Sequence, residues 1–534
     1  MKCSRERRSS LGGSSDNTAG ALTGRKKRGE KKIPPLFIAL YLAVSAVLIL
    51  TVCSRSSALY GFNLWDDANS YFTMGKSIFR GKVPYRDLFD QKGILLYFIY
   101  GLASLISYRD FTGVFIMESL CAAAAAAGIY AILCMYLRRT TAMILTPLSL
   151  AVMYSSVSFY WGGSAEEFNM PFIIWGIYIL LRTLRRGIGR AGIFVCGVLA
   201  GCVFNIKFTS LGFFIAQAFI IMLCRASGKR ARSGAARLGA FVSAGLLYLL
   251  GMAAATVPFV LYFAAQNAVY EWLYVYVYLN VFVYSEKMEF TARLYRMAKV
   301  IYWQLLKNIP VSALIAAAYI HGAYVFAVRR DGEQRKTYAA MLLALISSCF
   351  FIYIGGVELV YYFYPVTAFS VLGFVLPGRV AELIKLKLRI KKSAPYLLCA
   401  VSFAAAFAAA LLLSPNPGEM KAVGRDHWLY SFRDVIESSG IEDPGLINIS
   451  CFDQGLYTVT GIVPECRYYQ TQTIHLDDIE DVQKEFIKSD ICDFVLTRDV
   501  GLDHSHDMYD LIAEREGILG GTPHVYYLYR RNGT

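Results

Sequence analysis

Long apolar stretches recur through the first three quarters of this chain, and they limit the folds that are open to it. A helix needs about 20 apolar residues, within a range of about 17–25, to cross the hydrocarbon core of a bilayer. A backbone in lipid must also satisfy its own hydrogen bonds, which a helix does. The pattern therefore predicts an all-α polytopic membrane protein. The stretches that approach the required length are 35–53, 93–107, 111–136, 141–160, 168–182, 191–206, 208–224, 239–263, 305–328, 338–355, 359–377 and 395–413.

The composition agrees with lipid as the solvent for most of the chain. Of the 534 residues, 56% are hydrophobic and 17% are charged, whereas soluble domains carry about 25% charged residues. The net charge of +15 is unevenly divided. Residues 1–414 hold 44 Lys and Arg against 18 Asp and Glu, and residues 415–534 hold 10 against 21. Because the cations lie in loops between apolar stretches and form no basic face of a soluble domain, we expect no nucleic-acid partner.

Charge and hydropathy divide the chain into three parts. Residues 1–32 form a basic head that we expect to be disordered, and the first apolar stretch behind it is expected to be an uncleaved signal anchor. Residues 33–414 form the transmembrane domain. Residues 415–534 are predicted to form a small soluble α/β domain, because apolar runs alternate there with a polar, helix-like stretch. These segments are 446–451, 480–489, 491–497 and 525–529.

The basic loops predict the orientation of the membrane domain, because Lys and Arg collect on the cytoplasmic side. All the basic clusters fall on one side only if the short stretch 93–107 does not cross. We therefore expect about eleven spanning helices in a cell membrane, with 93–107 lying at the outer surface. The N-terminus is expected to be cytoplasmic and the C-terminal domain extracytoplasmic. The clusters are the head, Arg138-Arg139, 182–190, 225–237, 329–336 and 379–392.

The first outer loop, 54–92, holds an unusual set of polar residues. Asp66 and Asp67 follow the first span, and Tyr71 comes four residues after Asp67. Asp90 and Lys92 lie at the end of the loop. A solvated loop whose charges only face water is the alternative interpretation. Two features favour a structured site instead: aromatic and charged residues interleave, and the loop leads directly into an apolar stretch held at the outer surface.

These residues resemble a known family. The carboxylate pair, the following tyrosine and the motif Gly-x-x-Pro-Tyr-x-Asp…Asp-x-Lys-Gly at 81–93 are similar to the GT-C glycosyltransferases. The closest subgroup is the bacterial relatives of protein mannosyltransferases and of the aminoarabinose transferase that acts on lipid A, which are family 39-like. The likeness in layout extends over residues 35–380. Where members often have His-Pro-Pro or Lys-Pro-Pro, this chain has Lys92-Gly93-Ile94.

The resemblance implies substrates and leaves one cofactor open. It implies a polyprenyl-phosphate sugar donor, surrounding membrane lipid, and a glycan, lipid or protein acceptor in the cell envelope. Some members depend on a divalent metal ion and others do not, so no cofactor is assigned and a metal ion stays open. His504 and His506 are expected at the surface rather than in a metal site, because no carboxylate–histidine spacing supports one.

Charged residues in two other outer turns are further candidates. Glu166 and Glu167 lie in the second outer loop, where relatives are similar in carrying an acid. Ser164 and Glu167 also have the spacing of a helix capping box, and the two interpretations are compatible. Lys207 lies between two apolar stretches, where it either binds a lipid phosphate or extends to the outer headgroups.

Tyrosine-rich stretches have two interpretations each. Tyr361, Tyr362 and Tyr364 begin a late span, and the resemblance puts such residues near the donor phosphate, whereas an interfacial aromatic belt is the alternative. For the tyrosines at 270–278 the belt is favoured over a lid that covers a lipid tail.

Chemistry and resemblance together predict a membrane glycosyltransferase. Asp66 is the expected general base and Asp67 the second choice, because the attacking acceptor group must lose a proton. Lys92 and Lys207 are expected to stabilise the leaving phosphate. Glu166 is expected to orient hydroxyl groups or to help to hold a divalent ion.

The remaining candidates are expected to bind substrate, and they are Tyr71, Asp90, Glu167, Tyr361, Tyr362 and Tyr364. The alternative function is a transporter or flippase of lipid-linked saccharides, and a polysaccharide polymerase or ligase is a third possibility. One shared cavity for Asp66, Glu166 and Lys207 would favour the transferase, and a central channel would favour transport.

Overall fold

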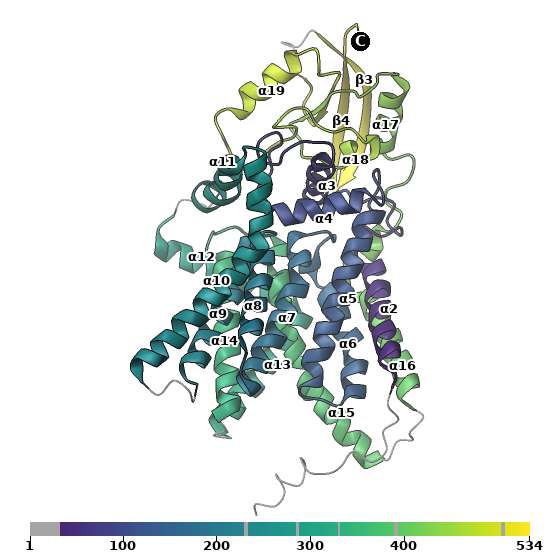
Figure 1. The fold of residues 1–534 in the computed structure, drawn as a ribbon. Helices are drawn as coiled ribbons and strands as arrows, with labels where there is room; N and C mark the ends of the chain where they lie inside the picture. The colour runs from purple at the N-terminus through teal and green to yellow at the C-terminus, as the bar shows by residue number, and fades with distance from the viewer. Residues whose placement is uncertain are drawn as a thin grey trace, which may run out of the picture.

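A computed structural model describes residues 33–228, 233–284, 288–328, 332–388, 394–502 and 508–533 of the chain (Figure 1). The basic head 1–32 and the pair His504 and His506 lie outside the described residues.

Most of the described chain is a bundle of apolar helices (Figure 1). Within the described residues, eight helices are long and apolar enough to cross a membrane. The expected polytopic, all-α membrane domain is confirmed. These spans are α2 (Pro35–Cys53), α5 (Thr112–Cys134), η2 (Phe208–Leu211) with α9 (Gly212–Ala226), α10 (Gly234–Ala265), α13 (Ile309–Val328), α14 (Gly332–Tyr353), η4 (Val360–Phe374) with α15 (Val375–Leu388), and α16 (Ala394–Leu413).

Three more helices run alongside these spans and complete the bundle (Figure 1). They are α6 (Arg139–Tyr154), α7 (Ala165–Arg186) and α8 (Arg190–Phe204). They are not counted among the eight because α6 and α8 are short, with 16 and 15 residues, and α7 has charged residues in its first and last turns. Together with the eight, they correspond to the eleven segments that were expected to cross.

Two short helices lie across the upper end of the bundle as it is drawn in Figure 1. α3 (Asp66–Ile78) carries the carboxylate pair, and α4 (Ile94–Ser104) occupies the stretch 93–107. With 11 residues, α4 is too short to span a bilayer. The two helices cross at Gly75 and Gly101, where a Cβ atom on Gly75 would come within 2.5 Å of the Gly101 amide nitrogen. This close approach fixes α3 directly above α4.

The C-terminal domain lies above α3 and α4 (Figure 1). Its sheet has the strand order β1-β2-β4-β3, with β1 parallel to β2 and the other neighbours antiparallel. The expected small α/β domain is confirmed, but β3 was not predicted because most of its side chains are exposed and its apolar residues do not alternate with polar ones. The elements are η5 (Pro417–Glu419), α17 (Trp428–Ser438), β1 (Leu446–Ile449), α18 (Leu456–Thr460), α19 (Ile479–Lys488), β2 (Phe494–Arg498), β3 (Tyr509–Leu519) and β4 (Thr522–Arg531).

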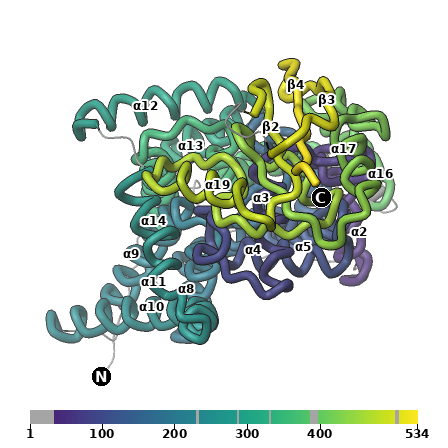
Figure 2. Tube along the Cα trace, turned by 90° about the horizontal axis from the view of Figure 1, so that it is seen from above, coloured from purple at the N-terminus to yellow at the C-terminus, as the bar shows by residue number. Residues whose placement is uncertain are grey.

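The tyrosine-rich stretch continues from α10, which projects to the side away from the C-terminal sheet (Figure 2). It forms α11 (Val269–Trp272) and the π-helix η3 (Leu273–Val283), and α12 (Phe290–Lys307) follows. Tyr270, Tyr274 and Tyr278 stack in one row with ring centroids 5.7 and 5.5 Å apart. The opposite face buries Tyr276 against the bundle. The tyrosine row is thus turned outward, as in an interfacial belt, while the other face covers the end of loop 54–92.

Candidate active site

The carboxylate pair occupies the first turn of α3. Negative side chains are favoured there because the unpaired amides of a helix N-terminus carry partial positive charge. The Asn69 side chain donates hydrogen bonds to the carbonyls of Asn63 and Trp65, both at 2.8 Å, and so holds the chain as it enters the helix. The two carboxylates therefore stand at a fixed position above the bundle.

The two acids have different surroundings. Asp67 Oδ2 accepts hydrogen bonds from the hydroxyls of Tyr71 at 2.9 Å and Tyr361 at 2.8 Å. Burial alone would raise the pKa of Asp67, but Lys92, the two hydroxyls and Lys207 together lower it. Asp67 is therefore a permanently charged acceptor. It joins α3 to the start of the η4 span.

Asp66 is half-buried and has fewer partners. Its Oδ1 accepts the backbone amide of Asp67 at 2.9 Å. Burial, and then the charge of Asp67, raise the pKa of Asp66 to about 6. A carboxylate with a pKa near neutrality can take up a proton during turnover, as a general base must.

Lys92 is brought to the acids by the turn that closes the loop. Tyr85 has left-handed backbone (φ 70°), and its hydroxyl donates to the Lys92 carbonyl at 2.7 Å. The Lys92 ammonium lies 5.5 Å from the centroid of the Tyr71 ring. Burial would lower the pKa of Lys92, but Asp67 and Asp90 raise it, so the ammonium stays charged. Burial raises the pKa of Asp90, although the nearby charge of Lys92 opposes this shift.

Gly93 explains why Lys92 and Lys207, which are far apart in the sequence, belong to neighbouring segments. The Gly93 amide donates to the Ile206 carbonyl at 3.0 Å, and the Leu95 amide donates to the Asn205 carbonyl at 2.8 Å. A Cβ atom on Gly93 would lie 2.1 Å from the Asn205 carbonyl oxygen. Only glycine permits this backbone pairing, which sets the chain at Lys92 beside the turn at Lys207.

Lys207 is buried and forms an ion pair with Glu166, at the start of α7. Its ammonium also lies 3.6 Å from the centroid of the Tyr362 ring. The second Glu166 oxygen, Oε2, is buried and has no hydrogen-bond partner among the described residues. We call Asp66, Asp67, Tyr71, Lys92, Glu166, Lys207, Tyr361 and Tyr362 the acid–lysine cluster.

Two candidate residues lie next to this cluster rather than in it. The Ser164 hydroxyl accepts the Glu167 amide at 2.9 Å, and the Glu167 carboxylate accepts the Gly163 amide at 2.8 Å. The predicted side-chain cap is thus confirmed, with the carboxylate reaching one residue further back than in the usual capping box. Tyr364 packs its ring against Phe159, with the ring centroids 5.4 Å apart.

A cavity of about 240 Å³ opens beside the cluster. Its lining includes the cationic side chains of Lys92 and Lys207, together with Arg293 from α12. It also includes the apolar side chains of Ile352, Ile354 and Val357. We call this space the lysine cavity. Its combination of cations and hydrocarbon suits a ligand with an anionic head and an apolar tail.

Some residues of this region were not anticipated. Tyr276 and Asn280 from η3 line the lysine cavity, and the Asn280 amide donates to the Gln91 carbonyl at 2.8 Å. Asn280 is the one amide in the apolar run of η3, a signal that could have been used. Glu118 is buried within the α5 span, where it accepts the Ser54 hydroxyl at 2.9 Å. A lone acid in a span is a similar signal.

The C-terminal domain is bonded directly to α3. The Thr73 hydroxyl donates to Asp453 at 2.6 Å, and the Ser70 hydroxyl and the Gln470 amide group exchange hydrogen bonds at 2.9 and 3.1 Å. The Lys76 ammonium donates to the Tyr457 carbonyl at 2.9 Å. Burial lowers the pKa of Lys76 to about 7 and raises that of Asp453. This buried polar network fixes the rotation of the helix that carries the carboxylates.

The described side chains include no ready-made cluster of metal ligands. No group of three or more His, Cys, Asp or Glu among them lies close enough together to hold a metal ion. Asp67 and Glu166 are instead engaged by tyrosine hydroxyls and by Lys207.

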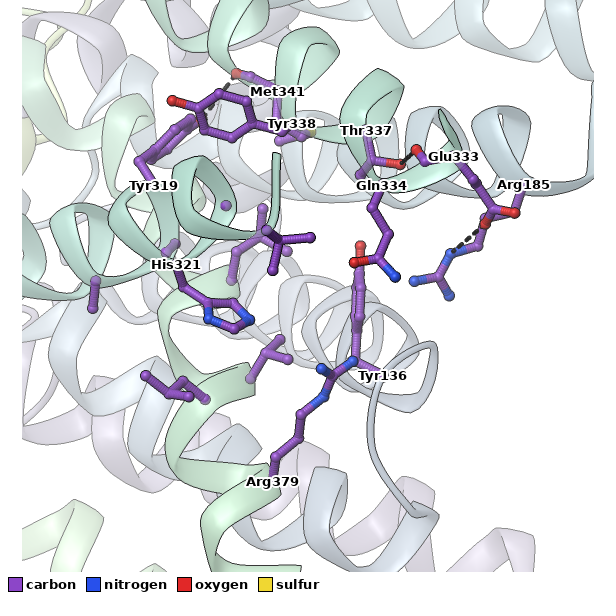
Figure 3. A pocket seen from close by; sticks show the side chains of 17 residues that line it. Tyr136, Arg185, Tyr319, His321, Glu333, Gln334, Thr337, Tyr338, Met341 and Arg379 are labelled. Carbon is purple, nitrogen blue, oxygen red and sulfur yellow. Dashed lines mark hydrogen bonds and ion pairs between the residues drawn. The ribbon is translucent and has the colours of Figure 1, made fainter. Parts of the chain in front are cut away.

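Another pocket, of about 380 Å³, lies in the membrane bundle away from the cluster, between α13, α14 and α15 (Figure 3). Arg185, His321 and Arg379 line it, and Arg185 approaches Glu333 to 3.8 Å. None of the candidate residues reaches this pocket.

The arrangement defines a class of protein. Apolar helices in a bundle, two short helices across one end and a small α/β domain above them make up the polytopic GT-C fold. The chain is similar to ArnT from Cupriavidus metallidurans. The structure of ArnT bound to undecaprenyl phosphate matches with a TM-score of 0.55 and 11% identity, over 93% of this chain and 98% of that one. The apo structure matches with a TM-score of 0.56 and 10% identity, over 92% and 97%.

A weaker match is the oligosaccharyltransferase of Archaeoglobus fulgidus in complex with Zn and sulfate, with a TM-score of 0.46 and 13% identity over 86% of this chain and 67% of that one. No protein-family model and no curated protein sequence matches the chain. At these identities the similarity to ArnT establishes the fold, and it confirms the fold class expected from the sequence.

Proposed function

We propose that this protein is a membrane glycosyltransferase that moves a sugar from a polyprenyl-phosphate donor to an acceptor at the outer face of the membrane. The observation that carries the proposal is that two buried lysines, whose charges act on Asp67 of the carboxylate pair, line a cavity that also has apolar lining residues. The fold shared with ArnT, whose structure was determined with undecaprenyl phosphate bound, supports the same donor class.

The donor is proposed to bind in the lysine cavity. Its phosphate lies against Lys92 and Lys207. The first part of its polyprenyl chain lies against the apolar residues Ile352, Ile354 and Val357. Glu166 holds Lys207 in place through their ion pair, and its unpartnered Oε2 is available to accept a sugar hydroxyl. Tyr71 and Tyr361 hold Asp67, whose negative charge favours the protonated form of both lysines.

The transfer is a substitution at the anomeric carbon. Asp66 accepts the proton of the acceptor hydroxyl while the acceptor oxygen forms a bond to that carbon. The bond between the carbon and the phosphate oxygen breaks, and its electron pair stays on the phosphate. Lys92 and Lys207 stabilise the negative charge that develops there. The products are the glycosylated acceptor and a polyprenyl phosphate.

Transport of a lipid-linked saccharide is less well supported. Transporters place their polar sites near the bilayer midplane, between paired repeats. Here the carboxylate pair begins α3, a short helix across the end of the bundle that is bonded to the C-terminal domain (Figure 1).

The proposal is tested by incubating the purified protein in nanodiscs with a panel of polyprenyl-phosphate sugars and measuring sugar release and transfer. We expect turnover of at least one donor. Lys207→Gln should weaken donor binding by about 10–100-fold, the value of a charge-assisted hydrogen bond. The exposed lysine of α12 provides the control Lys299→Gln, which should leave binding unchanged. Equal donor binding by both variants would contradict the site.

A further inference from the structure

A second and larger cleft lies between the membrane bundle and the C-terminal domain. It has a volume of about 640 Å³, and nothing in the acid–lysine cluster lines it. Its sides come from four segments: the start of loop 54–92, the turn at Trp161, the segment after α16, and the β3–β4 hairpin. Tyr60, Phe62 and Trp428 are buried and give it aromatic walls.

Arg55 is held rigidly at one side of this cleft. Its guanidinium lies 3.9 Å from the centroid of the Trp161 ring, and its Nε donates to Asn416 Oδ1 at 3.0 Å. Asn416 in turn donates to the Tyr160 carbonyl at 2.6 Å. No hydrogen bond or ion pair of the described chain reaches the two terminal nitrogens of Arg55. A stacked guanidinium with its fork unused is a pre-organised donor of hydrogen bonds.

Three carboxylates supply acceptors around the same cleft. Glu419, Asp426 and Glu516 are exposed, and none of them forms an ion pair within the described residues. The cleft therefore combines a fixed donor, carboxylate acceptors and aromatic surface. Hydroxyl groups both donate and accept hydrogen bonds, so a polyhydroxylated ligand can use the whole lining. The excess of carboxylates disfavours an anionic ligand.

A row of aromatic rings connects this cleft with the acid–lysine cluster. The centroid of Trp161 lies 5.4 Å from that of Tyr160, which lies 5.2 Å from that of Trp65. Trp65 lies 5.0 Å from Tyr361, whose hydroxyl is bonded to Asp67. Burial and then the charge of Asp66 raise the pKa of Tyr160, which places the expected base beside this row.

We propose that this cleft binds the saccharide part of the acceptor, as a neutral or amino-bearing oligosaccharide whose reacting hydroxyl extends along the aromatic row to Asp66. The inference rests on the proposed transferase function, because it assigns the second substrate of that reaction. The cleft would thus hold the acceptor and the lysine cavity the donor.

The test uses isothermal titration calorimetry to measure the Kd of three trisaccharides for the full-length protein in nanodiscs. The probes are chitotriose, its cationic de-acetylated form, and anionic trigalacturonate. We expect the neutral and cationic probes to bind at millimolar concentration and the anionic probe to bind more weakly. Arg55→Lys keeps the charge but loses the fork, and Glu516→Gln removes an acceptor. Each should raise the Kd by about tenfold or more.

Two controls make the result specific. Glu514→Gln changes an exposed acid on the same hairpin that does not line the cleft, and it should leave the Kd unchanged. Lys207→Gln should weaken donor binding but not trisaccharide binding. The inference is overturned if no probe binds, if trigalacturonate binds best, or if Arg55→Lys and Glu516→Gln match Glu514→Gln. Trisaccharide binding at the cleft without any donor turnover would instead contradict the transferase function.

Discussion

At the residue scale, Asp66 and Asp67 are neighbours in sequence with opposite shifts in pKa. Asp67 is stabilised as an anion by hydroxyls and lysines, so its proton affinity is low. Asp66 lacks those partners, and burial and the charge of Asp67 raise its pKa to about 6. A general base is most effective when its pKa is near the working pH, and this supports the proposal that Asp66 takes the acceptor proton.

The pH dependence of turnover follows from this difference. Only ionised Asp66 can accept a proton, so kcat should fall below pH 6, approaching about tenfold per pH unit. Burial lowers the pKa of Lys207 to about 8, so loss of the Lys207 charge should lower kcat again above that pH. Asp66→Asn should lower kcat by about 10²–10⁴-fold and abolish the fall below pH 6 while donor binding remains. Steady-state kinetics from pH 5 to 8 would measure both effects. If kcat of Asp66→Asn still fell below pH 6 in the same way, the general base would be another group.

Variants of the ion pair between Lys207 and Glu166 can distinguish the role of Lys207 in stability from its role in donor binding. Lys207→Met leaves a buried carboxylate unpaired, which costs about 3–5 kcal/mol, so Tm should fall markedly. Adding Glu166→Met should restore most of the Tm because the unpaired charge is removed. Donor binding should stay weak in both variants. Thermal unfolding and donor titration of the two variants would show whether the lysine has this binding role beyond its structural one.

At the element scale, α3 is placed by two contacts, one with α4 below it and one with the C-terminal domain above it. Thr73→Val keeps the shape of the side chain but leaves buried Asp453 without one donor, at a cost of about 1–3 kcal/mol. We expect a lower Tm and a lower kcat with an unchanged Kd for the donor. The control Ser438→Ala alters an exposed hydroxyl on α17 and should change stability by less than about 0.5 kcal/mol. Loss of stability in Thr73→Val with full kcat would show that the domain does not position the helix.

The pairing of residues 93–95 with 205–206 is a second contact between elements. Gly93→Ala would drive a Cβ atom against the Asn205 carbonyl and separate the segments that carry the two lysines. Donor affinity should fall although no charged group has changed. Gly234→Ala, at the start of α10, meets no atom within 4 Å and is the matched control. Equal donor titrations for the two variants would argue against this account of how the lysines are juxtaposed.

At the scale of the whole molecule, the proposed chemistry requires the C-terminal domain to be outside the cell. In a background without native cysteines, Glu442→Cys on the exposed surface of that domain should react with a membrane-impermeant maleimide in intact cells. Ser10→Cys in the basic head should react only after lysis, because positive segments stay in the cytoplasm. The reverse pattern would invert the topology and remove the site from the outer face.

The sequence by itself determined the class of architecture. Apolar length and loop charge predicted the helical bundle, and the shortness of 93–107 predicted that it would not cross, which agrees with the 11-residue α4. These properties are local, because the cost of placing each segment in lipid depends on its own residues. The signal failed for β3, an exposed strand with little apolar periodicity.

Only the tertiary structure decided which of the candidate residues meet. Asp67 and Tyr361 are 294 positions apart and bonded, whereas Glu166 and Glu167 are adjacent and face different partners. The Thr73–Asp453 contact and the cleft at Arg55 had no signal in the sequence, and the lone amide of Asn280 gave no indication of its partner. The reason is physical: pairing across a fold depends on backbone approach at points such as Gly93, and on the low dielectric that burial creates, and neither is a property of one segment alone.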